Sequence, residues 1–246
     1  MAVFSDNLLL LHIPKAGGQW AKTYAKRHVP GMNFPEDLDY PFPIGHIPLR
    51  DIEAFTGRPP SSWAKIVAII RDPYEQQLSQ FLYWLGRYYE GGRHEHDVYT
   101  WQCEQRALKR DVPPLEEWLS HPGCDFHVWY EERVGVKVKS TAARSGYLEF
   151  GSYYRYWLEI DGEIPDNVEI VRFERLNEDF PKAVAEFAGG VHEPGERVNV
   201  GPPKRDTHSY YSLVAMELVE RKFTWAFENH YKPWPRPAWT VTHGAV

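Results

Sequence analysis

Residues 7–18 read Asn-Leu-Leu-Leu-Leu-His-Ile-Pro-Lys-Ala-Gly-Gly, and they give the clearest structural signal in the chain. The apolar run from Asn7 to Ile13 is short and is stopped by Pro14, so its length suits a buried β-strand better than a helix. A glycine-containing turn follows, and a helix is expected over residues 19–27. A strand, a turn and a helix in this order are typical of an α/β protein.

A second strand and helix of the same kind follow further along the chain. The segment Lys65 to Ile70 is rich in β-branched residues and predicts another buried strand. After it, Asp72 is a good N-cap and Pro73 suits the first position of a helix. Apolar residues then recur at the i, i+3, i+4 and i+7 spacing of an amphipathic helix, at Leu78, Phe81, Leu82 and Leu85.

The rest of the chain continues this alternation. A third strand is expected at residues 168–173. Further helices are expected at residues 99–109, 115–119, 147–160, 177–188 and 209–229. Strands that alternate with helices predict a central, mainly parallel sheet flanked by helices on both faces. We expect one domain over residues 1–246, in which residues 91–145 form an insertion over the sheet.

The composition restricts the classes of function that are open to the chain. Its 246 residues include 28 basic and 34 acidic side chains, which give a formal charge of −6, and 43% of residues are apolar. This apolar share can bury a real core, so extensive disorder is excluded. The acidic balance argues against a broad nucleic-acid or membrane-surface role, but it leaves room for a small basic pocket that binds an anion.

Targeting and redox features point to the cytoplasm. The longest apolar run near the N-terminus, Leu8 to Leu11, is far shorter than the roughly 20 residues of a membrane span. The N-terminus also lacks the pattern of a secretory signal. The two cysteines, Cys103 and Cys124, form no C-x-x-C pair, which excludes a disulfide framework and favours free thiols in a reducing cytoplasm.

Two turns carry the residues of a predicted anion site. Gly17 and Gly18 allow close approach of a ligand to a helix N-terminus, and Lys15 adds a positive charge. Arg71 follows the next strand, so it should lie at the same sheet edge, where its planar fork suits a phosphate and Ser79 could add a hydroxyl. The alternatives are a glycine-rich turn with a surface lysine, and an arginine paired with Asp72 or Glu75. The spacing does not match the Mg-nucleotide P-loop, because the lysine precedes the glycines.

Other polar residues are weaker candidates. His46 lies in a Gly-His-Ile-Pro context and could act as a base near neutral pH, or it could be an ordinary loop histidine. Lys204, Arg205 and Thr207 precede the last helix and could touch a phosphate, or form a solvated basic turn. We interpret His12 as structural and residues 93–97 as a solvated loop rather than a metal site.

Together, these motifs resemble those of a known family. Residues 12–18, H-I-P-K-A-G-G, resemble the H-I-P-K-T-G-G opening of the carbohydrate-type sulfotransferases that use 3′-phosphoadenosine 5′-phosphosulfate (PAPS). Residues 71–79 are similar to the R-D-P-x-x-R-x-x-S motif that this family uses for the 3′-phosphate, and residues 169–176 are similar to a later strand and its exit. The resemblance is close over residues 7–85 and loose over residues 146–230.

The resemblance implies a three-layer, P-loop-like fold that binds PAPS. Lys15, Gly17 and Gly18 would hold the 5′-phosphosulfate, and Arg71 and Ser79 the 3′-phosphate. The full set of implied cosubstrate-binding residues is Lys15, Ala16, Gly17, Gly18, Gln19, Trp20, Arg71, Ser79, Lys204 and Arg205. The chain departs from the family in having Gln19-Trp20 where Thr or Ser is usual, and Gln76 where Arg is frequent.

The implied reaction is in-line transfer of a sulfuryl group from PAPS to a hydroxyl acceptor, either a carbohydrate or a small molecule. Lys15 and His46 would be the catalytic residues, with His46 as the base. The insertion at 91–145 would contribute to the acceptor side, and no metal, nucleic acid or membrane anchor is expected. Two alternatives stay open: a nucleotide-dependent kinase, and a catalytically silent protein that binds the cosubstrate with the same fold.

Overall fold

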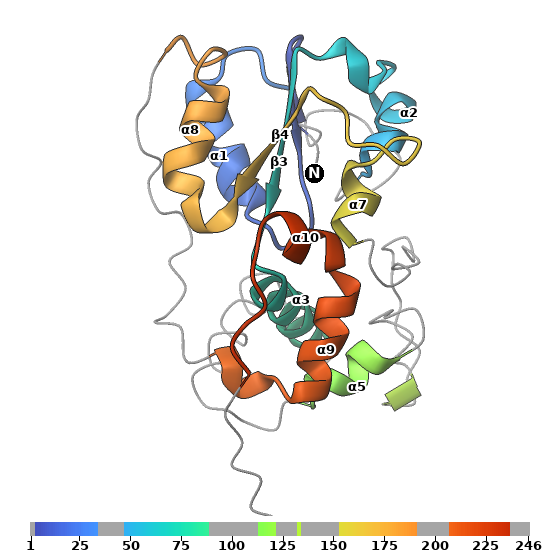
Figure 1. Cartoon of the computed structure of the whole chain (residues 1–246). Coiled ribbons are helices and arrows are strands. Elements are labelled where there is room, and N and C mark those ends of the chain that lie inside the picture. Colours follow the sequence, from blue (N-terminus) through green and yellow to red (C-terminus); the bar gives the residue numbers. More distant parts are fainter. Residues whose placement is uncertain are drawn as a thin grey trace, which may run out of the picture.

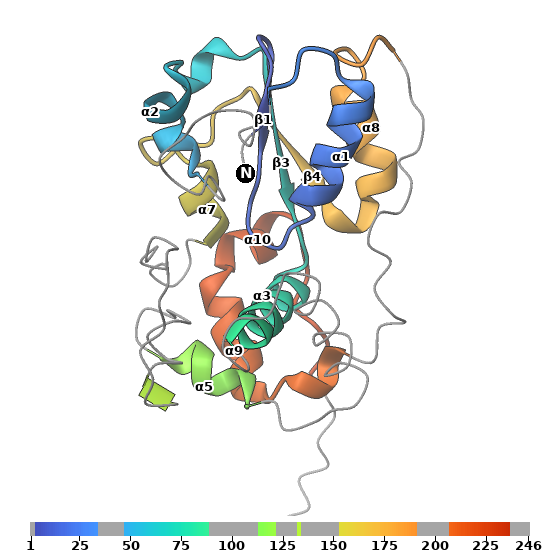
Figure 2. The same cartoon turned by 180° about the vertical axis from the view of Figure 1, so that it is seen from behind.

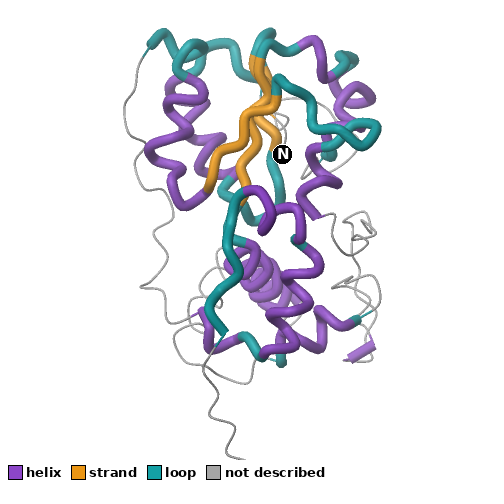
Figure 3. Tube along the Cα trace, viewed as in Figure 1, coloured by secondary structure: helices purple, strands orange, loops and turns teal. Residues whose placement is uncertain are grey.

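A four-stranded sheet lies at the centre of the structure. The computed structural model describes residues 3–33, 47–88, 113–121, 132–133, 153–190 and 207–236. The strands are β1 (Val3–Phe4), β2 (Leu8–Leu11), β3 (Lys65–Ile70) and β4 (Val168–Arg172), and their order in the sheet is β1-β2-β3-β4. They are drawn in orange at the centre of Figure 3. β2, β3 and β4 are parallel, whereas β1 pairs antiparallel with β2. The predicted α/β class and mainly parallel sheet are therefore confirmed, and β1 is an addition to the three predicted strands.

Helices cover both faces of the sheet. α1 (Gly18–His28) and α8 (Leu176–Val184) lie on one face, and α2 (Ile52–Thr56) and α7 (Tyr153–Leu158) lie on the other (Figures 1 and 2). All four residues of β2 are buried, as expected for a strand between two helical layers. A strand covered on both faces needs apolar side chains on both faces, and this accounts for the run of four leucines in β2.

A second group of helices lies beyond the carboxyl ends of the parallel strands. It consists of α3 (Pro73–Tyr88), α5 (Leu115–Ser120), α9 (Leu213–Lys222) and α10 (Thr224–Asn229) (Figure 1). α9 packs against both α3 and α5, and α10 contacts α7. The turn after β2 and the start of α3 therefore lie where the sheet meets this helical group. Among the described helices, none combines the length and the apolar character that a membrane crossing requires.

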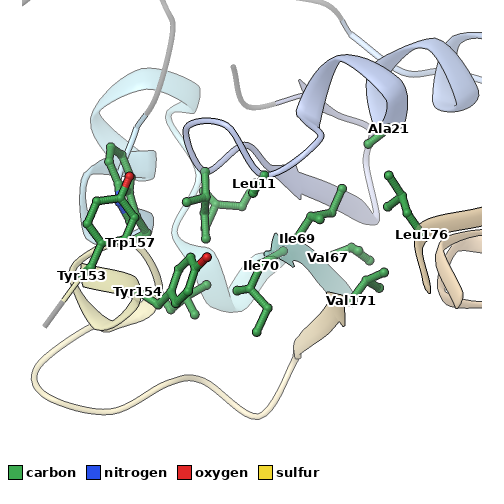
Figure 4. Close-up of a cluster of buried hydrophobic side chains, with 14 of the residues drawn as sticks. Leu11, Ala21, Val67, Ile69, Ile70, Tyr153, Tyr154, Trp157, Val171 and Leu176 are labelled. Carbon is green, nitrogen blue, oxygen red and sulfur yellow. The ribbon is translucent and has the colours of Figure 1, made fainter. Parts of the chain in front are cut away.

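The core follows the alternation of side chains along the strands. Val67, Ile69 and Val171 face the layer of α1 and α8, where Ala21 and Leu176 meet them (Figure 4). Ile70 points the other way, toward α7. On that helix Tyr153, Tyr154 and Trp157 are at most 1% exposed, so these aromatic residues belong to the core.

The largest difference from the predicted elements is at the C-terminal helix. One helix was expected over residues 209–229, but the structure has a 3₁₀ turn (Thr207–Tyr210) followed by α9 and α10. Ser212 caps α9 by accepting a hydrogen bond from the backbone N–H of Ala215. Phe223 separates the two helices, because its φ of −117° and ψ of 28° depart from helical values while its ring is buried. Tertiary packing of that ring outweighs the helical periodicity.

Smaller differences concern where the other elements end. The aromatic helix expected over residues 147–160 is described from Tyr153 and ends at Leu158, since Ile160 instead pairs with Glu163 in an isolated bridge. α8 ends at Val184 rather than at residue 188. The helix predicted at residues 99–109 lies outside the described residues, as does most of the predicted insertion.

Candidate functional site

Two turns meet at the carboxyl ends of β2 and β3. The strands are parallel neighbours, so the turn after β2 and the residue after β3 lie at one sheet edge. Arg71 Nη1 donates a hydrogen bond to the carbonyl oxygen of Lys15 at 3.3 Å. Lys15 and Arg71 are thus in direct contact, although they are 56 residues apart in sequence.

The backbone of the first turn is left-handed at two positions. Lys15 has a φ of 59° and Gly17 a φ of 96°. A side chain at Gly17 would be strained by this φ, and its Cβ would lie 2.7 Å from the ring of Phe173. At Gly18, a Cβ would fall 1.8 Å from Cδ2 of His12. Both glycines therefore let a ring of the protein itself pack against the turn, which agrees with the structural interpretation of His12.

The side chains that flank the glycines have different surroundings. The ammonium of Lys15 lies 4.2 Å from the ring centroid of Tyr83, on α3, in a cation–π contact. Gln19 is exposed at the start of α1. Ala16 is fully buried, and the Trp20 ring is buried between α1 and α8.

The side chains of Trp20 and Ala16 pack in the core. Trp20 stacks on Tyr24 with 5.4 Å between ring centroids and meets Phe180 edge-on at 5.5 Å. Its backbone N–H donates to the carbonyl of Gly17. The side chains of Ala16 and Trp20 therefore stabilise the helix on the sheet, and the expected contact of this turn with a cosubstrate stays a prediction.

Arg71 is held from several sides. The hydroxyl of Tyr154 accepts from the backbone N–H of Arg71 at 3.0 Å and donates to its carbonyl oxygen at 2.6 Å. Burial raises the pKa of Tyr154, which keeps this hydroxyl protonated and able to donate. The guanidinium lies 4.6 Å from the ring centroid of Phe173, and Nη2 bonds Oε2 of Glu75 at 3.0 Å. The pairing with Glu75 is the one of the two salt-bridge alternatives that forms.

One donor of Arg71 is left over. The residue is only 8% exposed, and its Nε has no hydrogen-bond partner within the described part of the chain. An unbonded buried N–H costs about 1–3 kcal/mol. The guanidinium is therefore able to gain a further bond to an oxygen-rich ligand without losing an existing one at Nε.

The neighbouring residues form a buried polar network around the turn. The amide of Gln76 donates to the carbonyl of Pro14 at 2.9 Å and to the hydroxyl of Tyr153 at 2.8 Å. Gln76 thus fixes the turn from α3. Ser79 is buried on the same helix, and its contact with a phosphate stays a prediction.

Asp72 is the N-cap of α3, as the sequence predicted. Its Oδ1 accepts from the backbone N–H groups of Tyr74 and Glu75, and its own N–H donates to Glu174. Burial and the nearby carboxylates of Glu174 and Glu75 raise the pKa of Asp72 above its ordinary value of 3.8. Ionised Asp72 therefore carries an electrostatic cost in the folded state, despite its capping bonds.

We predict that Asp72→Asn is at least as stable as wild type at pH 7, because asparagine caps equally well and carries no charge. Asp72→Ala, which loses the cap, should be less stable by about 1 kcal/mol. The advantage of Asn should be largest above the raised pKa of Asp72 and vanish as the pH falls below 3.8, where aspartate is protonated in both states. Thermal unfolding of the three proteins across this range tests it. A larger advantage of Asn at low pH than at neutral pH would contradict the electrostatic explanation.

Several predicted residues lie outside the described residues. These are His46, Lys204, Arg205 and the His-rich segment 93–97. Thr207 is described, and its hydroxyl donates to Oε1 of Glu75 at 2.8 Å. In the described ranges, no group of three His, Cys, Asp or Glu side chains is arranged to hold a metal ion.

Phe173 is a site residue that sequence reasoning missed. It follows β4 directly, as Arg71 follows β3, so parallel strand order was a signal that could have placed it at the same edge. Its ring lies against both Gly17 and the guanidinium of Arg71. The Phe173 ring therefore packs against both turns.

Comparison with known proteins identifies no relative, since no family model, curated protein or solved structure matches the chain.

Proposed function

We propose that the chain is a PAPS-dependent sulfotransferase with a P-loop-like fold. The observation that carries this proposal is the hydrogen bond from Arg71 Nη1 to the carbonyl of Lys15. It joins the two motifs whose residues resemble the phosphosulfate and 3′-phosphate segments of that family. A ligand with anionic groups at two separated points is the chemistry that such a pair of turns suits.

The donor set fits the 3′-phosphate end of PAPS. The buried Nε of Arg71 lacks a partner among the described residues, and phosphate oxygens are the preferred partners of a guanidinium. The ring of Phe173 supports the flat side of the same guanidinium and limits its rotation. Arg71 is thus preorganised for binding, because less side-chain freedom is lost when the ligand arrives.

The strained backbone at Lys15 gives the proposal further support. A left-handed φ costs a non-glycine residue about 1–2 kcal/mol, and such strain is concentrated at functional sites. A glycine would hold the same turn without that cost. Lysine at this position is explained if its ammonium is needed at the sheet edge.

The chemistry assigned to the residues is charge stabilisation and proton removal. Bound at this edge, PAPS supplies the sulfuryl group and leaves as 3′-phosphoadenosine 5′-phosphate. The ammonium of Lys15 neutralises charge that develops on the departing phosphate oxygen. His46 takes the proton from the acceptor hydroxyl, whose oxygen forms the new bond to sulfur as the bond from sulfur to the bridging oxygen breaks. The Gly17–Gly18 turn positions the group in line with the acceptor.

Calorimetric titration with 3′-phosphoadenosine 5′-phosphate tests the binding part of the proposal. We expect saturable binding of this product nucleotide and much weaker binding of ATP with Mg²⁺, because the Gly-Lys-Ser/Thr sequence of a Mg-nucleotide site is absent. Transfer is then tested by screening hydroxyl-bearing sugars and small phenols with labelled PAPS. Preference for ATP with Mg²⁺ would instead favour a kinase, and binding without transfer to any acceptor would favour a silent binding protein.

A further inference from the structure

The guanidinium of Arg71 is already paired with a carboxylate. Nη2 lies 3.0 Å from Oε2 of Glu75, one turn along α3, and both side chains are largely buried, with 9% and 16% of their surface exposed. An ion pair in such surroundings is screened much less by solvent and salt than a surface pair. An anion that accepts from Nη2 of Arg71 must therefore compete with Glu75.

The geometry of the guanidinium shows how a phosphate can displace the Glu75 carboxylate from Arg71. In arginine, Nε–H and one N–H of Nη2 point along the same edge of the planar group. Glu75 bonds Nη2, and Nε has no partner in the described residues. The present pairing thus leaves the Nε donor of this edge unused. A phosphate can accept from both donors at once, and bidentate bonds of this kind are the stronger ones.

Glu75 has a second partner, which links it to another part of the fold. Its Oε1 accepts from the hydroxyl of Thr207, at the start of the 3₁₀ turn before α9. The next turn is anchored separately, because the hydroxyl of Tyr211 donates to the carbonyl of Tyr74 at 2.6 Å. Glu75 can therefore leave Arg71 and still be held by Thr207 against a fixed neighbour.

We propose that Glu75 is an internal competitor that occupies Arg71 until an oxyanion displaces it. The carboxylate pairs with Nη2 of the buried guanidinium when no phosphate is bound, and a phosphate that reaches the edge of Nε and Nη2 exchanges with it. In its application to the 3′-phosphate of PAPS this inference rests on the proposed function. It deepens that function, because it makes the affinity of the site depend on an exchange of anions at Arg71.

The test compares the binding of 3′-phosphoadenosine 5′-phosphate and of inorganic phosphate to the full chain and to three variants. Glu75→Gln removes the competing charge, and we expect its affinity for the nucleotide to rise about tenfold, as when a binding-competent state becomes the main one. Glu75→Asp keeps the charge but shortens the side chain, so it should raise the affinity by a smaller factor. Glu220→Gln is the matched control, because Glu220 bonds Tyr74 and Arg236 but not Arg71. Its affinity should stay within about twofold of wild type.

The outcomes separate this inference from the proposed function. Wild type that binds the nucleotide, together with a Glu75→Gln variant that binds it equally or less tightly, overturns the competitor and leaves the function standing. Wild type that binds neither ligand, with a folded Glu75→Gln variant that gains inorganic phosphate alone, supports the competitor and counts against PAPS. Equal gains in Glu75→Gln and Glu220→Gln overturn the inference, because they reflect net charge alone. Circular dichroism of each variant establishes that it is folded.

Discussion

Arg71→Lys is expected to weaken the binding of 3′-phosphoadenosine 5′-phosphate by about 10- to 100-fold, since hydrogen bonds to charged groups contribute roughly 1.5–3 kcal/mol each. Lysine keeps the positive charge but loses the fork formed by Nε and Nη2. It also loses the planar surface that stacks on Phe173 and the bond from Nη1 to the carbonyl of Lys15. Calorimetric titration measures the loss directly.

The matched control for Arg71 is Arg172→Lys. Arg172 ends β4 at the same sheet edge, and its guanidinium contacts an aromatic ring, that of Tyr231, at 4.6 Å. Its side chain is 42% exposed and its Nε also has no hydrogen-bond partner among the described residues, but no described bond joins it to the first turn. The affinity of this variant should stay within about twofold of wild type. Equal losses in the two variants would show that general positive potential, rather than the fork of Arg71, binds the nucleotide.

The elements that could be predicted from the sequence are those whose signal is local. β3 has the predicted bounds, because a β-branched run between polar residues has few other solutions. The cap of α3 also follows from local chemistry at Asp72. The adjacency of Lys15 and Arg71 required one further step, which was the rule that parallel neighbours place their carboxyl ends at one edge.

The parts that escaped prediction depend on contacts between distant residues. Thr207 and Glu75 are 132 residues apart, and no local pattern pairs them. The break at Phe223 is set by where its ring is buried, and the periodicity of the flanking helices continues through it. The Trp20 side chain packs against Tyr24 and Phe180, and this contact with a residue 160 positions away is likewise set by the fold rather than by the local sequence.

The second large effect is expected at Lys15. In Lys15→Met the unbranched stem can still lie against Tyr83, while the ammonium that would stabilise the departing oxygen is gone. Removal of one such charge-stabilising group typically lowers turnover by about 10²- to 10³-fold. We expect the affinity for the product nucleotide to fall as well, because its 5′-phosphate carries in full the charge that the ammonium neutralises. The measurements are the sulfation rate at saturating PAPS and the calorimetric affinity for 3′-phosphoadenosine 5′-phosphate.

Lys26→Met provides the comparison for Lys15→Met, since Lys26 is an exposed lysine in the last turn of α1, the helix that the first turn begins. It removes the same charge from the same segment, yet it is distant from the sheet edge and should keep wild-type turnover. Methionine at position 15 keeps the strained φ of Lys15. Wild type and Lys15→Met therefore differ at this position only in the charged end of the side chain. Should Lys15→Met sulfate a validated acceptor as fast as Lys26→Met, the ammonium has no part in the chemistry. The left-handed backbone conformation of Lys15 would then serve only the shape of the turn.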